Sequence, residues 1–121
     1  KNSKTGLDIK QGGIFPIVHG IRALSLEHMI EVNNTFDRIS ELVKRRVLEK
    51  QTGDNLSEAL KQFFKLRLAQ QLAHPVGADT KGTNNIDINL LDRTERDLLR
   101  HSLHVVKKFK QWLGYHYQIR D

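Results

Sequence analysis

The sequence contains no cysteine. This absence excludes disulfide bonds, thiolate nucleophiles and thiolate-bound zinc, and it suits a reducing, cytoplasmic setting. Aromatic residues make up only 7% of the chain, and no apolar run approaches the ~20 residues that a membrane-spanning helix needs. We therefore expect a cytoplasmic protein that makes no contact with a membrane.

The motifs of several enzyme classes are missing as well. The chain has no Gly-Lys-Ser/Thr phosphate loop, no His-Glu-x-x-His zinc motif and no nucleophile elbow. His101 and His104 are three residues apart, and His116 follows about three turns later on the same expected helix. Ordinary surface histidines are favoured over zinc ligands, because the zinc motif is absent and a pair would need a third ligand. The sequence predicts no catalytic residue, no metal ligand and no cofactor held by this chain.

What is present is helical periodicity in four segments of a chain long enough for one domain. The expected helices are residues 16–30, 35–47, 54–74 and 92–117. The expected N-caps are Thr35 for the second helix and Asp54 or Asn55 for the third. Asp92 opens the fourth helix, with Glu95 in the capping-box position. At most one short extended piece is expected, in the stretch GLDIK near the start.

Four amphipathic helices with short links predict an all-α fold, an antiparallel bundle of four main helices. The apolar side of the third helix is expected to include Leu56, Leu60, Phe63, Phe64, Leu68 and Leu72. One link is long, the Gly- and Asn-rich loop from Pro75 to Leu91, and loops of this length are usually functional or disordered. We expect residues 1–13 to be a lead-in from an upstream domain outside this sequence, and residues 14–121 to form the helical domain.

Charge points to an anionic partner. Twenty Lys and Arg face fourteen Asp and Glu, a balance that suits a nucleotide, RNA or an acidic protein surface. The only basic clusters, Lys44–Arg46 and Lys107–Lys110, lie on helical patterns with no aromatic platform between them. Solvated helix surface is therefore favoured over a nucleic-acid stripe.

The stretch KQGG, Lys10–Gly13, precedes the first helix and raises the question of a phosphate loop. The lysine stands before the glycines, which fits neither standard phosphate-binding motif. We expect Gly12 and Gly13 to supply the unusual backbone angles of a turn. Free N–H groups at the start of the helix would still be able to meet an anion.

Two arginines lie on apolar stretches, Arg22 on the first helix and Arg67 on the third. A buried guanidinium needs acceptors, because leaving it unpaired costs several kcal/mol. One alternative is an internal ion pair to a carboxylate such as Glu95 or Asp92, or an arginine whose apolar stem lies along the protein surface while its guanidinium stays in water. The other is a rim that faces a substrate phosphate or an acidic neighbouring domain. The residues alone leave both open.

Read in order, four stretches carry a resemblance. They are LDIKQGGIFPIVHGIRALSLEHMI, TFDRISEL, LSEALKQFFKLRLAQQL and NNIDINLLDRTERDLLRHSLHVVKKFKQWL. The succession covers about Leu7 to Leu113 and resembles the nucleotidyltransferase substrate-binding domain family. In bacterial signal-transduction proteins this domain follows a nucleotidyltransferase domain similar to part of protein-PII uridylyltransferase. Cyclic-nucleotide-binding and CBS domains often precede both.

The resemblance assigns site residues by motif. The residues it implies for substrate or nucleotide binding, or for docking to the neighbouring domain, are Lys10, Gly13, Arg22, Arg67, Gln71, Asn85, Glu95 and Arg96. Two positions depart from the family pattern: Ile88 stands where a proline is common, and Asp92 replaces the usual serine cap. Asp also caps helices, so the fold expectation is unaffected.

The resemblance implies a C-terminal substrate-binding or positioning module that is not catalytic alone. Its partner would be the upstream nucleotidyltransferase domain of the same chain, with Mg²⁺ and a nucleoside triphosphate bound there, and its substrate an acidic protein or a nucleotide. Nucleotidyltransferases hold Mg²⁺ with an Asp-x-Asp pair after a Gly-Ser turn, and this sequence contains neither. The alternative is a regulatory protein-interaction bundle with no ligand of its own; a weaker third reading is RNA binding.

Overall fold

The structure is a computed structural model that describes residues 6–73 and 85–118. The described part begins with strand β1 (Gly6–Asp8) and a π-helical turn, η2 (Lys10–Ile14). Three helices follow, α1 (Phe15–Glu27), α2 (Thr35–Lys44) and α3 (Lys50–Ala73). Strand β2 (Asn85–Asp87), a 3₁₀ turn, η4 (Ile88–Leu90), and helix α4 (Arg93–Tyr117) complete it. The predicted all-α fold with four main helices is confirmed.

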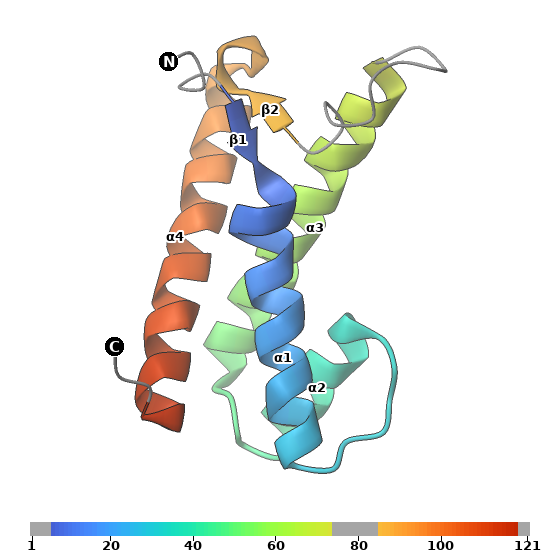
Figure 1. Ribbon diagram of the computed structural model, residues 1–121, viewed down its shortest axis with the longest axis vertical. Helices are drawn as coiled ribbons and strands as arrows, with labels where there is room; N and C mark the ends of the chain where they lie inside the picture. The colour runs from blue at the N-terminus through green and yellow to red at the C-terminus, as the bar shows by residue number, and fades with distance from the viewer. Residues whose placement is uncertain (1–5, 74–84, 119–121) are drawn as a thin grey trace.

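Three long helices lie side by side, with α1 in front of α3 and α4 beside it (Figure 1). The short α2 packs against the lower part of α1 and α3. Strand β1 pairs antiparallel with β2, with Leu7 opposite Ile86, and so joins the start of α1 to the start of α4. Helix α3 runs opposite to both, whereas α1 and α4 run in the same direction (Figure 1).

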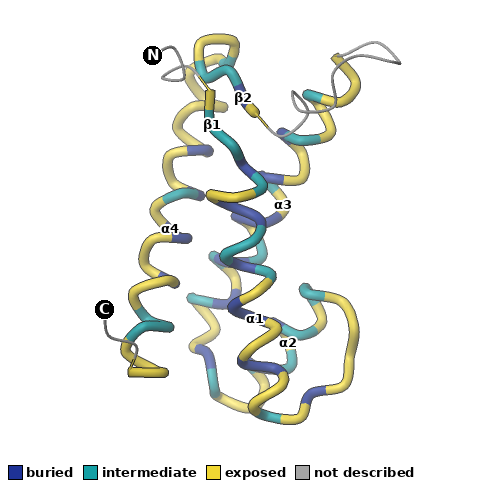
Figure 2. Tube along the Cα trace, in the orientation of Figure 1, coloured by how far each residue is buried: buried dark blue, intermediate teal, exposed yellow. Residues whose placement is uncertain are grey.

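One hydrophobic core runs through the bundle. Buried positions form stripes on the inner sides of α1, α3 and α4, and exposed positions cover the outside (Figure 2). The largest fully buried side chains are Phe63, Ile9, Ile17, Ile21, Leu24, Leu42, Leu56 and Leu60. Because Ile9 is fully buried, the residues just before η2 are anchored in the same core as the helices.

The expectation for the glycine pair was wrong. Residues 10–14 are a helical turn continuous with α1, and neither Gly12 nor Gly13 has a left-handed φ. Gly13 is needed for close approach instead: a Cβ there would lie 2.7 Å from the ring of Phe63 on α3. Side-chain size, and not backbone angle, makes this position a glycine.

Two predicted helix starts were also wrong. The N-cap of α2 is Asn34, not Thr35, because the Asn34 side chain accepts hydrogen bonds from the backbone N–H groups of Phe36 and Asp37. Helix α3 begins at Lys50, before the expected Asp54 or Asn55. Its first turns carry side-chain bonds four residues apart, Lys50 to Asp54 and Gln51 to Asn55, both 3.1 Å long.

The upper half of α3 differs from its predicted packing. Phe64, Leu68 and Leu72 were expected on the apolar side, but they are 38%, 54% and 77% exposed. The last buried residue of α3 is Leu66, beyond which the helix extends away from α4 (Figure 1). The spacing of apolar residues along one helix does not show where the neighbouring helices end, and therefore does not show which of these residues they cover.

Helix α4 matches its prediction closely. The Asp92 side chain accepts from the Glu95 N–H at 2.8 Å, and the Glu95 carboxylate accepts from the Asp92 N–H at 2.9 Å. This capping box begins the helix where the sequence placed it. Of the predicted loop, residues 75–84 lie outside the described part, and residues 85–90 form β2 and η4. Across the described ranges, no helix combines the length and apolar character that crossing a bilayer requires.

Candidate functional site

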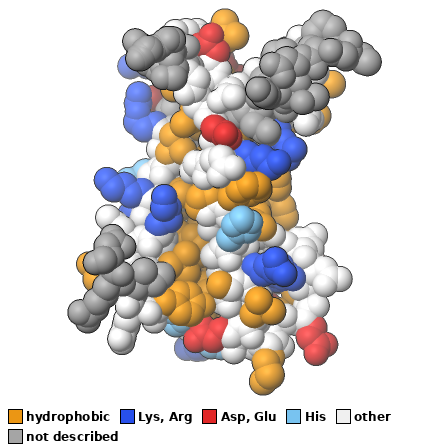
Figure 3. Space-filling model, viewed as in Figure 1, with side chains coloured by type: hydrophobic (Ala, Val, Ile, Leu, Met, Phe, Trp, Pro, Cys, Tyr) orange, Lys and Arg blue, Asp and Glu red, His pale blue; other side chains and the backbone are white. Residues whose placement is uncertain are grey.

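A hollow with a volume of about 480 Å³, the α1–α4 groove, lies between α1 and α4. Its lining residues are Gln11, Phe15, Pro16, His19, Gly20 and Ala23 from η2 and α1, with Lys110, Leu113 and Tyr117 from α4. A second hollow of about 340 Å³ shares His19 and Ala23 with it and adds Arg22 and Leu26. Lys, Arg and His side chains border a band of hydrophobic side chains on this face (Figure 3).

A row of cationic and aromatic groups follows the α1 side of the groove. The Lys10 ammonium lies 5.3 Å from the centroid of the Phe15 ring, a cation–π contact. The Phe15 ring stacks on His19, with centroids 4.9 Å apart. One turn further on, Arg22 is exposed and has no ion pair or hydrogen bond among the described residues. Its guanidinium is therefore available to an anionic ligand.

Helix α4 supplies the other wall. Lys110, Leu113 and Tyr117 are spaced by three and four residues, which places them on one side of the helix. Gly20 allows α1 and α4 to approach, because a Cβ there would lie 2.6 Å from Leu113 and 2.7 Å from Phe109. No Asp or Glu of the described segments lines either hollow. The charged residues that line the two hollows are therefore all basic.

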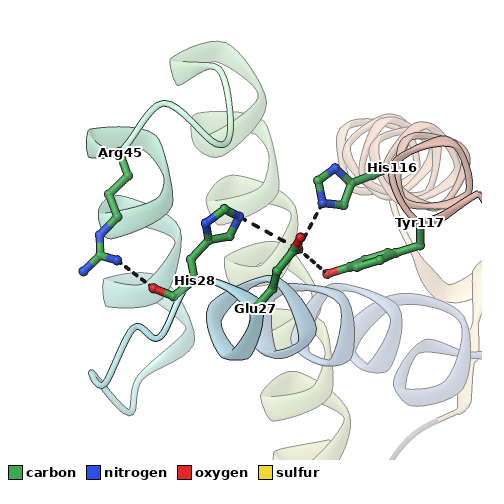
Figure 4. A network of polar contacts seen from close by, with 5 residues as sticks. All are labelled: Glu27, His28, Arg45, His116 and Tyr117. Atoms are coloured by element: carbon green, nitrogen blue, oxygen red, sulfur yellow. Dashed lines mark hydrogen bonds and ion pairs between the residues drawn. The ribbon is translucent and has the colours of Figure 1, made fainter.

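One end of the groove is held by the Glu27 network, which consists of Glu27, His28, Arg45, His116 and Tyr117 (Figure 4). The Glu27 carboxylate accepts hydrogen bonds from His116 Nε2 and from the Tyr117 hydroxyl, each 3.0 Å long. His28 Nε2 lies 3.8 Å from the same oxygen, and the His28 carbonyl accepts from Arg45 at 2.8 Å. The network ties the last turns of α1 and α4 together and connects them to α2.

These hydrogen bonds shift the pKa values of Glu27 and Tyr117. The hydrogen bond from His116, followed by that from Tyr117, holds the pKa of the Glu27 carboxyl below its usual value. Burial and then the hydrogen bond to Glu27 raise the pKa of Tyr117 to about 12. At neutral pH an ionised carboxylate therefore accepts from a neutral phenol at the end of the groove.

The structure places Lys10 and Arg22 beside this groove, and Gly13 lies in the same η2 turn as Lys10. The other predicted site residues lie on α3, β2 and α4. Arg67 lies on α3; its Nε is buried without a hydrogen-bond partner in the described segments. Gln71 is exposed near the end of α3. Neither Arg22 nor Arg67 forms an ion pair with a described residue, so the alternative of an ion pair to Glu95 or Asp92 is not realised there.

Three other predicted residues have visible structural roles. Gly13 packs under Phe63, and Glu95 completes the α4 capping box. Asn85 lies in β2, opposite Asp8 of β1. These contacts account for the residue type at Gly13 and Glu95 without a ligand.

Arg96 lies at the first turn of α4, where its Nε donates to the Leu91 carbonyl at 3.2 Å. With Arg93, Asp97 and Arg100 it lines a polar hollow separate from the α1–α4 groove. Binding roles for Arg96 and the other site residues remain predictions. Among residues 6–73 and 85–118, no three His, Asp or Glu side chains are grouped so that they could hold a metal ion.

One family model, described as "putative nucleotidyltransferase substrate binding domain", matches residues 1–117, nearly the whole chain. The chain belongs to this family. The predicted resemblance is thereby confirmed, and the domain is associated by its family with a nucleotidyltransferase and with substrate binding. Neither a curated protein nor a solved structure matches the chain.

Sequence reasoning missed several groups of this substrate-binding domain's groove. His19 and Phe15 are four residues apart, a spacing that already predicts contact on a helix. Lys110 was assigned to solvated helix surface, because nothing local shows that it faces α1. Glu27 and Tyr117 are ninety residues apart in the chain, so no sequence spacing could pair them.

Proposed function

We propose that this domain holds an anionic group of a substrate in the α1–α4 groove while a nucleotidyltransferase region of the parent protein performs the chemistry. The observation that carries the proposal is the basic border of the groove, formed by Lys10, Arg22 and Lys110, with no described acidic residue lining it. Such a border attracts phosphate or carboxylate groups and orients them through charge-assisted hydrogen bonds.

The contribution to catalysis is positional. Holding a substrate beside an active site replaces a bimolecular encounter with an oriented one, which lowers the entropic part of the barrier. Phe15 and Tyr117 add apolar surface for the uncharged part of the substrate. In this proposal the chain is not catalytic by itself. Mg²⁺ and the nucleoside triphosphate are bound by the nucleotidyltransferase region, which is of the protein-PII uridylyltransferase type, and the basic groups of the groove face the phosphates from the other side of a shared cleft.

The test uses the domain together with its nucleotidyltransferase region, with UTP and inorganic pyrophosphate as probes. Amine labelling read by mass spectrometry should show that the probes protect Lys110, while the exposed Lys107 of the same helix stays reactive. Arg22→Gln should weaken UTP binding about tenfold, the effect of losing one charge-assisted hydrogen bond. Arg93→Gln, which changes another exposed arginine outside the groove, should alter binding less than about twofold.

A second function, a regulatory protein-interaction bundle, is favoured by the exposed side chains Leu26, Met29 and Val32 at the end of α1. If neither probe protects Lys110 and Arg22→Gln binds UTP normally, the proposed groove function is wrong. If Leu26→Ser or Met29→Ser then alters regulation of the parent protein, the interaction function replaces it.

A further inference from the structure

A second site lies on the other side of α4, between α4 and α3. This α3–α4 pocket has a volume of about 370 Å³, within the range of small-molecule pockets. Its lining residues are Thr52, Asn55 and Leu56 from α3, with His101, His104, Val105, Lys108, Phe109 and Trp112 from α4. It shares no lining residue with the α1–α4 groove.

One wall of the pocket is basic. His101, His104 and Lys108 are spaced by three and four residues, so their side chains share one side of α4. None of the three has an ion pair or hydrogen bond among the described residues. A lysine ammonium and two imidazoles that converge without an acidic partner form a site for an anion.

The acidic residues of the neighbouring α3 turns do not neutralise this wall. Asp54 pairs with Lys50 at 3.1 Å, and Glu58 pairs with Lys61 at 3.5 Å, both along α3 itself. Neither carboxylate lines the pocket, where α3 presents uncharged Thr52. The local charge therefore stays positive.

The rest of the pocket is apolar and aromatic. Leu56 is fully buried, and Val105 and Phe109 are 8% and 2% exposed, so they form its floor. Trp112 borders the pocket and is held by stacking on His116, with ring centroids 4.9 Å apart and planes 9° apart. An ordered indole beside an apolar floor suits a flat ring of a ligand.

We infer that the α3–α4 pocket binds a small aromatic phosphate. The phosphate lies against His101, His104 and Lys108, and the ring lies against the floor beside Trp112. The ligand needs both its phosphate and its ring. A phosphate alone leaves the apolar floor of the pocket uncovered, and an uncharged ring leaves the basic wall without an acceptor. The pocket is a different site from the groove, because the two share no lining residue and α3 supplies the pocket's other wall.

The first experiment uses phenyl phosphate as the probe. Trp112 is the only tryptophan of the sequence, so the fluorescence comes from one indole that borders this pocket. Phenyl phosphate should change the fluorescence saturably and shift the NMR signals of His101 and His104. Inorganic phosphate and phenol, which represent the two halves, should each bind at least about tenfold more weakly.

The second experiment uses a matched lysine pair. Lys108→Gln should weaken phenyl phosphate binding about tenfold, whereas Lys107→Gln, its exposed neighbour outside the pocket, should have less than about a twofold effect. His104→Gln provides a second variant on the same wall. Equal effects of the two lysine variants, equally tight binding of either half, or no saturable change would each overturn the inference. UTP protection of Lys110 would be unaffected by any of these results.

Discussion

At the scale of single residues, the position of one proton distinguishes Tyr117 from an ordinary surface tyrosine. Its hydroxyl donates to Glu27, whose carboxylate also accepts from His116. Removing the phenol proton would place two negative charges side by side, which adds to the cost of burying the phenolate. This is why the pKa of Tyr117 is raised to about 12 from 10.0.

The Tyr115→Phe variant leaves Tyr117 as the only tyrosine, so its ionisation can be followed by tyrosinate absorbance. We expect a midpoint at about pH 12, and a lower midpoint after Glu27→Gln. The sign follows from linkage: a raised folded-state pKa gives stability that is present below pH 10 and lost as the pH rises toward 12. A midpoint near 10 with the helical circular dichroism intact would contradict the network.

At the scale of elements, the local start signals of helices were only partly sufficient. The capping box of α4 was predicted correctly, because Asp92 and Glu95 satisfy each other's backbone within one turn. The start of α3 was not, because Asp54 and Asn55 are possible N-caps in sequence but lie inside the helix, where they bond to Lys50 and Gln51. Gly53 also lies inside α3, where a Cβ would be 2.5 Å from the Val43 side chain. A glycine that permits close packing and a glycine that ends a helix look the same in sequence.

The packing of η2 on α3 offers a matched pair of glycines. Gly13→Ala should lower the free energy of unfolding by about 1–3 kcal/mol, because the fully buried Phe63 ring must shift to admit the methyl group. Gly12→Ala has no atom within 4 Å of its new Cβ and should be neutral or slightly stabilising. Urea titrations measure both; similar losses in the two variants would show that backbone conformation, and not packing, requires these glycines.

At the scale of the whole molecule, the parallel course of α1 and α4 creates the groove. The β1–β2 pair joins their first turns and the Glu27 network joins their last turns, with Gly20 at a point of close contact between them. Both ends and the middle of the α1–α4 contact are therefore held by separate interactions.

Gly20→Ala should separate the helices and lower the free energy of unfolding by about 1–3 kcal/mol, since the methyl group meets Leu113 and Phe109. It should also weaken the UTP protection of Lys110, because the groove walls move apart. Gly114→Ala on α4, with open space around its Cβ, should be neutral or stabilising by up to about 1 kcal/mol. Thermal unfolding followed by circular dichroism separates the two; a stable Gly20→Ala variant would contradict the close contact.

The sequence by itself determined the number of helices, the capping box of α4 and several core positions, such as Leu56 and Leu60. The capping box depends on contacts between residues that are at most about four positions apart. The helices and their core positions follow from the regular spacing of apolar residues that a helix with one buried side shows. Family membership followed from the order of motifs along the chain.

Only the tertiary structure decided which residues share a site. It brought Lys110 to the wall of the groove opposite His19 and joined Tyr117 to Glu27. It left Leu68 exposed, although Leu68 follows the spacing of the apolar residues on α3. Each of these results depends on where a distant helix runs and where it ends. Sequence spacing carries no such distances, because packing between elements sets them.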